Sequence, residues 1–425
     1  MKIDRSIAPV TSDISSVRIP LPESSFLSNG IPVYSFDLAD QELVKVEVVF
    51  KSGLALQSQN LVAEFTAKML SEGTINRTGV DIANTIDFYG SFLEHSISKD
   101  FSSFTLYCLT KYADESLDIF ADILCNPSFP GKEFETHKRN GLQRFKVNSD
   151  KVSVLCKREF AKKLYVADHP YYSDIDETDF NLSIDQLQTH FSEMLNFSDA
   201  LIFAAGHVKQ TLMRSLDRAF GRVELKKKDK PEVLRVDNSL AQNSVIPKEG
   251  ALQSGIRIGR LLPIQRASTD YVPFSVLNTV LGGYFSSRLM SNIREDKGYT
   301  YGIGSGLIRN LASTTFLIST EVNAEHTQDT INEIKSEIDR LQNDKVPDME
   351  LNRVKNYMVG AYLKKSDGPF NVCDQFKSYF LHGIDLSYND IYLSEIQEVS
   401  SENVRDLAGQ FLNFKDLLQV VAGKL

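Results

Sequence analysis

The sequence predicts an α+β protein with two duplicated domains of similar fold, each a mostly antiparallel sheet covered by helices. Three observations predict this organisation. The chain has 425 residues, which is more than one hydrophobic core of about 250–300 residues holds. A sequence pattern recurs in both halves, which is the signature of an internal repeat. Each half also carries both strand-like and helix-like periodicities.

The repeat is clearest in two windows of eleven residues. Residues 196–206 read NFSDALIFAAG, and residues 413–423 read NFKDLLQVVAG, so the windows lie 217 residues apart. Four further identities follow the same offset: Leu124 and Leu341, Asn126 and Asn343, Pro130 and Pro347, Glu133 and Glu350. Agreement at one offset indicates a duplication, and the alternative is a coincidence of common strand-and-turn patterns.

Both halves mix the two kinds of element. Apolar residues alternate along 44–50, and residues 102–110 and 313–322 are also typical of strands. Apolar residues at helical spacing predict helices over 117–124 and 331–338. The sheets and helices of each half therefore form layers.

A polar, lysine-rich and aperiodic stretch separates the halves. It covers residues 224–250 and is typical of a linker. The predicted domains are residues 1–223 and 251–425. Two such domains joined by a polar strap would enclose a chamber between them.

Composition excludes several classes of function. The net charge is −9 with no basic block, so we expect no nucleic-acid partner. No apolar run approaches the ~20 residues of a membrane span, and the start MKIDRSIAPV lacks the apolar core of a signal peptide. The four cysteines have no paired spacing and fit free thiols in a reducing compartment. We expect a cytoplasmic protein without a membrane partner.

The stretch LVAEFTAKMLSEGT, residues 61–74, predicts a helix that ends at Gly73. An apolar stripe through Phe65 and Met69 faces a core. The other face carries Glu64, Ala67 and Lys68, which is an unusual group opposite so regular a stripe.

This region resembles the N-terminal half of the insulinase/pitrilysin-type zinc peptidases, which include the mitochondrial processing peptidase. The resemblance is carried by FKSG at residues 50–53 and MLSEGT at residues 69–74. In that family the helix bears His-x-x-Glu-His, and the resemblance aligns Glu64 with the first histidine, Ala67 with the general base and Lys68 with the second histidine. The family's later glutamate falls near Gln143 or Arg144. The resemblance thus implies no metal and no cofactor in this chain.

Glu64 and Lys68 stand in the favoured i, i+4 order. We therefore interpret the helix as a former metal site in which an ion pair has replaced zinc. The alternative is an ordinary solvated helix face. His95 ends a similar stretch, SFLEH, but lies in a predicted strand, where Glu94 and His95 would point to opposite faces.

The segment VLGGYFSSRLMSNIREDKGYTYGIGSGL, residues 280–307, resembles the matching segment in the second half of the same family. There an arginine and a tyrosine, seven residues apart, reach the zinc site opposite. The resemblance gives Arg294 and Tyr301 these roles, in which the arginine holds the substrate backbone and the tyrosine steadies the oxyanion. The alternatives are a surface arginine and a half-buried tyrosine, or Tyr299 in place of Tyr301.

The resemblance implies a non-catalytic, substrate-binding subunit that completes the active site of a heterodimeric zinc metallopeptidase. A partner subunit would carry His-x-x-Glu-His and the zinc, and the substrate would be a peptide or an unfolded segment. One alternative is a purely structural subunit, like the core subunits of respiratory complexes, in which Arg294 and Tyr301 are relics. The weakest alternative is an active enzyme with substitute ligands.

Overall fold

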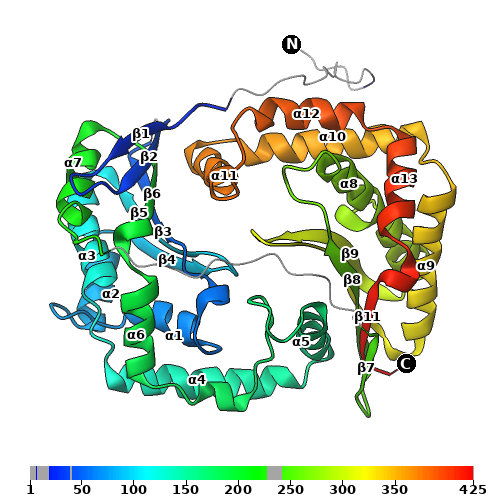
Figure 1. Ribbon diagram of the computed structural model, residues 1–425, viewed down its shortest axis with the longest axis horizontal. Helices are drawn as coiled ribbons and strands as arrows, with labels where there is room; N and C mark the ends of the chain where they lie inside the picture. Colours follow the sequence, from blue (N-terminus) through cyan, green and yellow to red (C-terminus); the bar gives the residue numbers. More distant parts are fainter. Residues whose placement is uncertain (1–5, 7–18, 39–40, 227–241, 425) are drawn as a thin grey trace.

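The computed structural model describes residue 6 and residues 19–38, 41–226 and 242–424. Two β-sheets lie on opposite sides of the molecule, as Figure 1 shows, and most helices lie outside them. The interior between the sheets is bordered on one side by α4 and on the opposite side by α10 and α12 (Figure 1).

The first sheet has six strands in the order β1-β2-β6-β3-β5-β4. Their bounds are β1 (Glu23–Phe26), β2 (Pro32–Asp37), β3 (Leu43–Phe50), β4 (Phe92–Ile97), β5 (Ser102–Leu109) and β6 (Leu201–Gly206). The central strand β3 is antiparallel to both β5 and β6, while β2 and β6 are parallel. Strand β4 forms one edge of this sheet.

The second sheet has five strands in the order β7-β11-β8-β10-β9. Their bounds are β7 (Ser244–Pro247), β8 (Gln253–Leu262), β9 (Thr300–Arg309), β10 (Thr314–Asn323) and β11 (Leu418–Gly423). The pair β7 and β11 is parallel, and the other neighbours are antiparallel. Strand β9 forms the edge that corresponds to β4 in the first sheet.

The two sheets repeat one topology. The order β2-β6-β3-β5-β4 matches β7-β11-β8-β10-β9, including the single parallel pair at the same place. Strands β6 and β11 lie 217 residues apart, as do the helices α6 and α13. The predicted architecture of two similar sheets covered by helices is therefore confirmed.

Helices cover the sheets in both halves. In the first half they are α1 (Val62–Leu70), α2 (Gly79–Phe88), α3 (Ala113–Cys125), α4 (Gly131–Ser149), α5 (Val152–Leu164), α6 (Ile184–Met194) and α7 (Gln210–Phe220). In the second half they are α8 (Tyr271–Asn278), α9 (Thr327–Asn343), α10 (Asp348–Lys365), α11 (Pro369–Leu381), α12 (Tyr388–Glu398) and α13 (Ser401–Phe411). Two π-helical segments, η5 (Thr279–Gly283) and η6 (Met290–Asp296), precede β9. Within the described residues, no helix combines the length and the apolar character needed to cross a membrane.

The sheets exchange one helix each. Helix α5 belongs to the first half but packs on β8 and β11 of the second sheet, where Cys156 donates to the carbonyl of Val420 at 3.3 Å. Helix α11 belongs to the second half but packs on β2 and β6 of the first sheet, where Phe376 contacts the ring of Phe36. The two helices are again 217 residues apart. The exchange is thus part of the repeat, and it ties the halves together.

Close backbone approach makes the α5 contact possible. A Cβ atom at Gly255 on β8 would lie 2.8 Å from the carbonyl oxygen of Val152. Only glycine therefore allows α5 to approach the sheet this closely. Val152 and Cys156 then fill an apolar cluster with Val420 and Ala422.

Four charged residues, two from β3 and two from α11, meet where α11 packs on the first sheet. Lys45 and Glu47 of β3 are 3% and 2% exposed, because α11 covers the inner face of the first sheet. Lys45 contacts Asp374 at 2.6 Å, and Lys377 contacts Glu47 at 2.6 Å and Asp374 at 2.9 Å. Lys45 and Glu47 are 3.3 Å apart. We call this group the α11 charge quartet. Each charge has an opposite partner, as a buried charge requires.

The division of the chain into residues 1–223, 224–250 and 251–425 stays a proposal. Strand β7 (Ser244–Pro247) lies within the range predicted as a linker and pairs with β11. Residues 227–241 of that range lie outside the described residues. Because α5 and α11 exchange sheets, the boundaries of the sequence halves also differ from the boundaries of the packed layers.

Candidate functional site

Helix α1 carries the three positions that the sequence predicts to be a former metal motif. The helix begins after Leu61 and ends at Leu70, three residues before the predicted stop at Gly73. Lys68 Nζ lies 2.5 Å from Glu64 Oε1, with the two side chains 26% and 48% exposed. The predicted ion pair is therefore present. A partly exposed pair of this kind contributes about 0.2–0.5 kcal/mol.

Ala67 differs from its two neighbours in the motif. It is 2% exposed and belongs to the first hydrophobic core. A glutamate at this position would bury an unpaired carboxylate, which is strongly unfavourable. The prediction that Ala67 shares the outer face of the helix with Glu64 and Lys68 is therefore wrong, because its methyl group packs in the core.

His95 lies close to the ion pair of Glu64 and Lys68, although its place in a predicted strand gave no reason to expect it there. Burial lowers the pKa of His95, and the nearby Lys68 charge lowers it further, against an opposite effect of Glu64. These residues come from β4 and α1, which are adjacent. Among the described residues, no group of three or more histidine, cysteine, aspartate or glutamate side chains could hold a metal ion.

Helix α4 passes beside α1 at the place where the family's later glutamate is expected. A Cβ atom at Gly141 would lie 3.3 Å from the ring of Phe65, so α4 approaches α1 closely. The nearby Arg144 donates to the carbonyl of Asn140 at 3.4 Å, within its own helix. Neither Gln143 nor Arg144 supplies the carboxylate of that family position.

In the second half, Arg294 lies on η6 and is 34% exposed. Its guanidinium carbon lies 4.8 Å from the centre of the Phe285 ring. Glu295 is 3.9 Å away, at the limit of an ion pair. Stacking on Phe285 holds the side chain in place and leaves most of its hydrogen-bond donors available.

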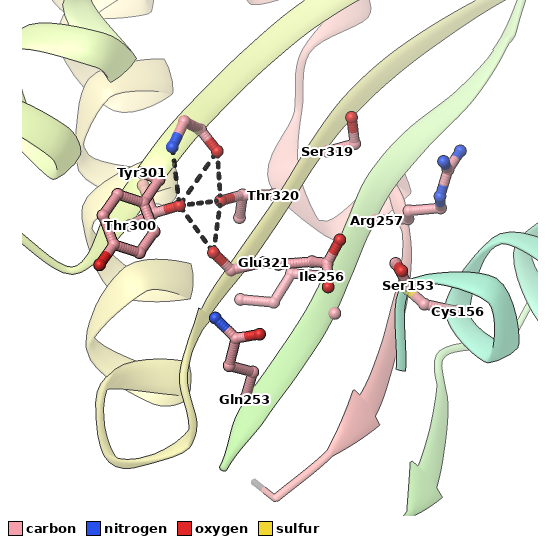
Figure 2. A pocket seen from close by; sticks show the side chains of 12 residues that line it. Ser153, Cys156, Gln253, Ile256, Arg257, Thr300, Tyr301, Ser319, Thr320 and Glu321 are labelled. Atoms are coloured by element: carbon pink, nitrogen blue, oxygen red, sulfur yellow. Dashed lines mark hydrogen bonds between the residues drawn. The ribbon is translucent and has the colours of Figure 1, made fainter. Parts of the chain in front are cut away.

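Tyr301 is the most exposed of the large apolar or aromatic side chains described, at 95%. The β9–β10 pairing is irregular between Thr320 and Val322, which places Tyr301 and Gly302 in a bulge. The hydroxyl of Thr300 donates to the carbonyl of Glu321 at 2.6 Å and so stabilises this bulge (Figure 2). A bulge redirects a side chain, and here Tyr301 points away from the sheet.

Tyr299 is the weaker candidate of the two tyrosines. Its ring stacks on His326 with the ring centres 4.2 Å apart, so the side chain is used in packing. Tyr301 forms no hydrogen bond with any residue that the structure describes. Of the two tyrosines left open by the sequence, Tyr301 is thus the more exposed, and Tyr299 is half-buried.

A polar pocket of about 440 Å³ lies beside Tyr301, between the inner face of the second sheet and α5 (Figure 2). Two charged side chains line it, Arg257 from β8 and Glu321 from β10. Burial lowers the pKa of Arg257. Arg294 does not line this pocket. No local sequence pattern points to Arg257 and Glu321, because only the register of β8 and β10 brings them to one face.

Comparisons with known proteins agree with this architecture. Residues 33–167 match the model "Insulinase (Peptidase family M16)", and residues 181–358 match "Peptidase M16 inactive domain". The chain is 24% identical to "Uncharacterized zinc protease YmxG" of Bacillus subtilis, covering 83% of this chain and 85% of that protein. It is 22% identical to "Non-peptidase homolog YmxG" of Helicobacter pylori, covering 88% and 87%.

A crystal structure described as the peptidase M16 inactive domain from Pseudomonas fluorescens has the same fold. The TM-score is 0.83 at 22% identity, covering 95% of this chain and 98% of that one. The chain belongs to the insulinase family, peptidase family M16. The match to the inactive-domain model and to a non-peptidase homolog supports an inactive member of this family, without a cofactor of its own. The assignment of Glu64, Ala67 and Lys68 to the zinc-motif positions stays a prediction.

Proposed function

We propose that this chain is the non-catalytic subunit of a heterodimeric zinc peptidase, and that it binds peptide substrate and completes the active site of its partner. The observation that carries the proposal is the contrast between the two halves. The motif positions on α1 hold an ion pair and a buried alanine. Tyr301 on β9 is 95% exposed and points away from its own sheet.

The exposure of Tyr301 supports a role outside its own chain. An aromatic side chain loses favourable burial when it is left in water. Edge strand β9 presents it beside a polar pocket, where a phenol donor would meet an incoming peptide carbonyl. Arg294, held by Phe285, would offer paired donors to the same peptide backbone.

The partner subunit would carry His-x-x-Glu-His and the zinc ion, which supplies the activated water when bound. The substrate would be a short peptide or an unfolded segment, bound in extended form at a sheet edge of the partner. We place the chain in the cytoplasm, which the free cysteines support: Cys108, Cys125, Cys156 and Cys373 form no disulfide.

Kinetics of the reconstituted pair test this proposal. The chain is mixed with His-x-x-Glu-His subunits from the same genome, and kcat/KM is measured on a quenched peptide. Tyr301→Phe and Arg294→Ala should each lower kcat/KM at least tenfold. The matched controls are Tyr357→Phe, which changes an exposed residue of α10, and Arg405→Ala, which changes a half-exposed residue of α13. Activity that needs this chain but ignores both site variants would contradict the proposed roles.

A stable complex without activity would support a purely structural subunit instead. Tight association and no cleavage of any peptide in a random library would be the decisive pair of results. Arg294 and Tyr301 would then be relics of an active ancestor.

A further inference from the structure

A second cavity lies where α8, α10, α11 and α12 converge, at the upper edge of the molecule in Figure 1. Its volume is about 250 Å³, and it is separate from the pocket beside Tyr301. Five tyrosines line it, together with three cations and a single carboxylate. The tyrosines are Tyr271, Tyr362, Tyr379, Tyr388 and Tyr392.

The charges lining this cavity do not balance. Among the described residues of the lining, Arg266, Arg309 and Lys365 are the cations, and Asp374 is the only acidic residue. Asp374 already contacts Lys45 at 2.6 Å and Lys377 at 2.9 Å in the α11 charge quartet. The cavity therefore has a surplus of positive charge that its own lining does not neutralise.

The two arginines are held by aromatic and hydroxyl groups rather than by acids. The guanidinium carbon of Arg266 lies 4.4 Å from the centre of the Tyr379 ring, and its Nη1 donates to Ser378 Oγ at 2.8 Å. Arg309 donates to the hydroxyl of Tyr271. Such contacts fix the orientation of a guanidinium but leave its charge without a counter-ion.

Two buried donors in this lining also lack acceptors. Arg266 Nε and the hydroxyl of Tyr388 are each buried and have no hydrogen-bond partner among the residues that the structure describes. Burial raises the pKa of Tyr388, so the phenol keeps its proton and remains a donor. A buried donor without a partner is unfavourable. Two of them beside one cationic cavity would gain from an acceptor that carries negative charge, once the side chains turn toward the cavity.

We propose that this cavity binds the carboxylate group of a peptide, with Arg266 and Tyr388 as its direct donors. The volume suits one carboxylate and the residue that bears it, but not a longer segment. This inference depends on the proposed function for the choice of a peptide, since a carboxylate ends every peptide chain. The group would be either the free C-terminus or an aspartate or glutamate side chain.

The position of the cavity gives such a contact a clear consequence. Its walls come from α11, which packs on the first sheet, and from α8, α10 and α12 beside the second sheet. A peptide anchored here would lie next to the interior between the sheets, where the exchanged helix joins both halves. The anchored group would therefore set the register of the rest of the peptide.

Direct binding to the isolated chain tests the inference without any partner subunit. A labelled nine-residue peptide is titrated by fluorescence anisotropy in three forms: with a free C-terminus, with an amidated C-terminus, and amidated with one internal glutamate. We expect one of the two carboxylate forms to bind at least tenfold more tightly than the plain amide. The form that binds identifies the source of the carboxylate. Equal affinity for all three forms, or no binding of any form, overturns the proposal.

Two variants connect the binding to this cavity. Tyr388→Phe removes a hydroxyl that has no partner within the described residues, so folding should be unaffected while affinity falls about tenfold. Arg266→Gln should reduce affinity at least as much. Tyr357→Phe and Arg405→Gln are the matched controls. Unchanged affinity in a folded Tyr388→Phe variant also overturns the proposal. If the complex lacks peptidase activity but the chain still binds the carboxylate, the proposed catalytic role is refuted and the carboxylate site is not.

Discussion

Replacing Glu47 by glutamine should destabilise the protein through the α11 charge quartet. Glu47 is 2% exposed and accepts hydrogen bonds from Lys377 at 2.6 and 2.7 Å. Burial lowers the pKa of Lys45, but the charges of Glu47 and Asp374 outweigh this effect and raise the pKa above its ordinary value. Glutamine keeps the shape of the side chain and removes its charge, which leaves Lys45 and Lys377 with Asp374 alone.

The expected loss follows from the burial of each partner. Breaking a buried ion pair from one side costs about 3–5 kcal/mol. The side chain of Asp374 is 45% exposed and that of Lys377 is 19% exposed, so solvent screens part of the effect. We therefore expect Glu47→Gln to lower the free energy of unfolding by about 3 kcal/mol. The matched control is Asp406→Asn in the exposed pair of Arg405 and Asp406, where the change should be below about 1 kcal/mol.

Urea-induced unfolding followed by circular dichroism measures both variants. Hydrogen exchange adds a local readout, because the quartet holds α11 against the first sheet. Amides of α11 should exchange faster in Glu47→Gln, while those of α9 should not change. A loss of unfolding free energy no larger than that of Asp406→Asn, with unchanged protection of the α11 amides, would show that the α11 charge quartet does not stabilise the protein as proposed.

Three further predictions concern other contacts. Asp122→Asn should cost about 2 kcal/mol above pH 5, measured by urea unfolding, because Asp122 is buried and accepts from Arg77 at 2.5 Å. Burial raises the pKa of Asp122, but its hydrogen bonds outweigh burial and lower the pKa below 3.8. The stabilisation by Asp122 is therefore present above about pH 4 and lost as the pH falls further. A difference in unfolding free energy between the wild type and Asp122→Asn that grows on acidification would contradict this prediction. Ala67→Glu should lower the melting temperature by several degrees by burying a carboxylate; an unchanged value would show that the site still accommodates the family's glutamate. Gly255→Ala should increase proteolysis near α5, since its Cβ would clash with Val152; unchanged cleavage would argue against that tight contact.

The sequence was informative where a pattern is local. The alternation over residues 44–50 predicted β3, and the spacing of Phe65 and Met69 predicted α1. The repeat predicted two sheets of one kind, because similar windows at one offset fold into corresponding strands. The i, i+4 spacing of Glu64 and Lys68 likewise predicted their ion pair.

The parts that escaped prediction depend on contacts distant in the sequence. No local pattern indicates that α5 and α11 exchange sheets, because an amphipathic helix does not specify which sheet it covers. Lys45 and Glu47 look like a solvent-exposed strand face, yet α11 buries them. The approach of His95 to the α1 ion pair and the grouping of Arg257 with Glu321 arise from strand register and helix placement.

The proposed heterodimer, in which the partner carries the zinc, is tested most directly by measuring zinc content and peptidase activity. Both are measured for this chain alone, for its partner alone and for the purified complex. We expect no zinc in this chain, one zinc per complex, and cleavage only by the complex, with cleavage abolished by a chelator and restored by zinc. Zinc bound at stoichiometric amounts by this chain alone, or cleavage by the isolated chain, would contradict this expectation.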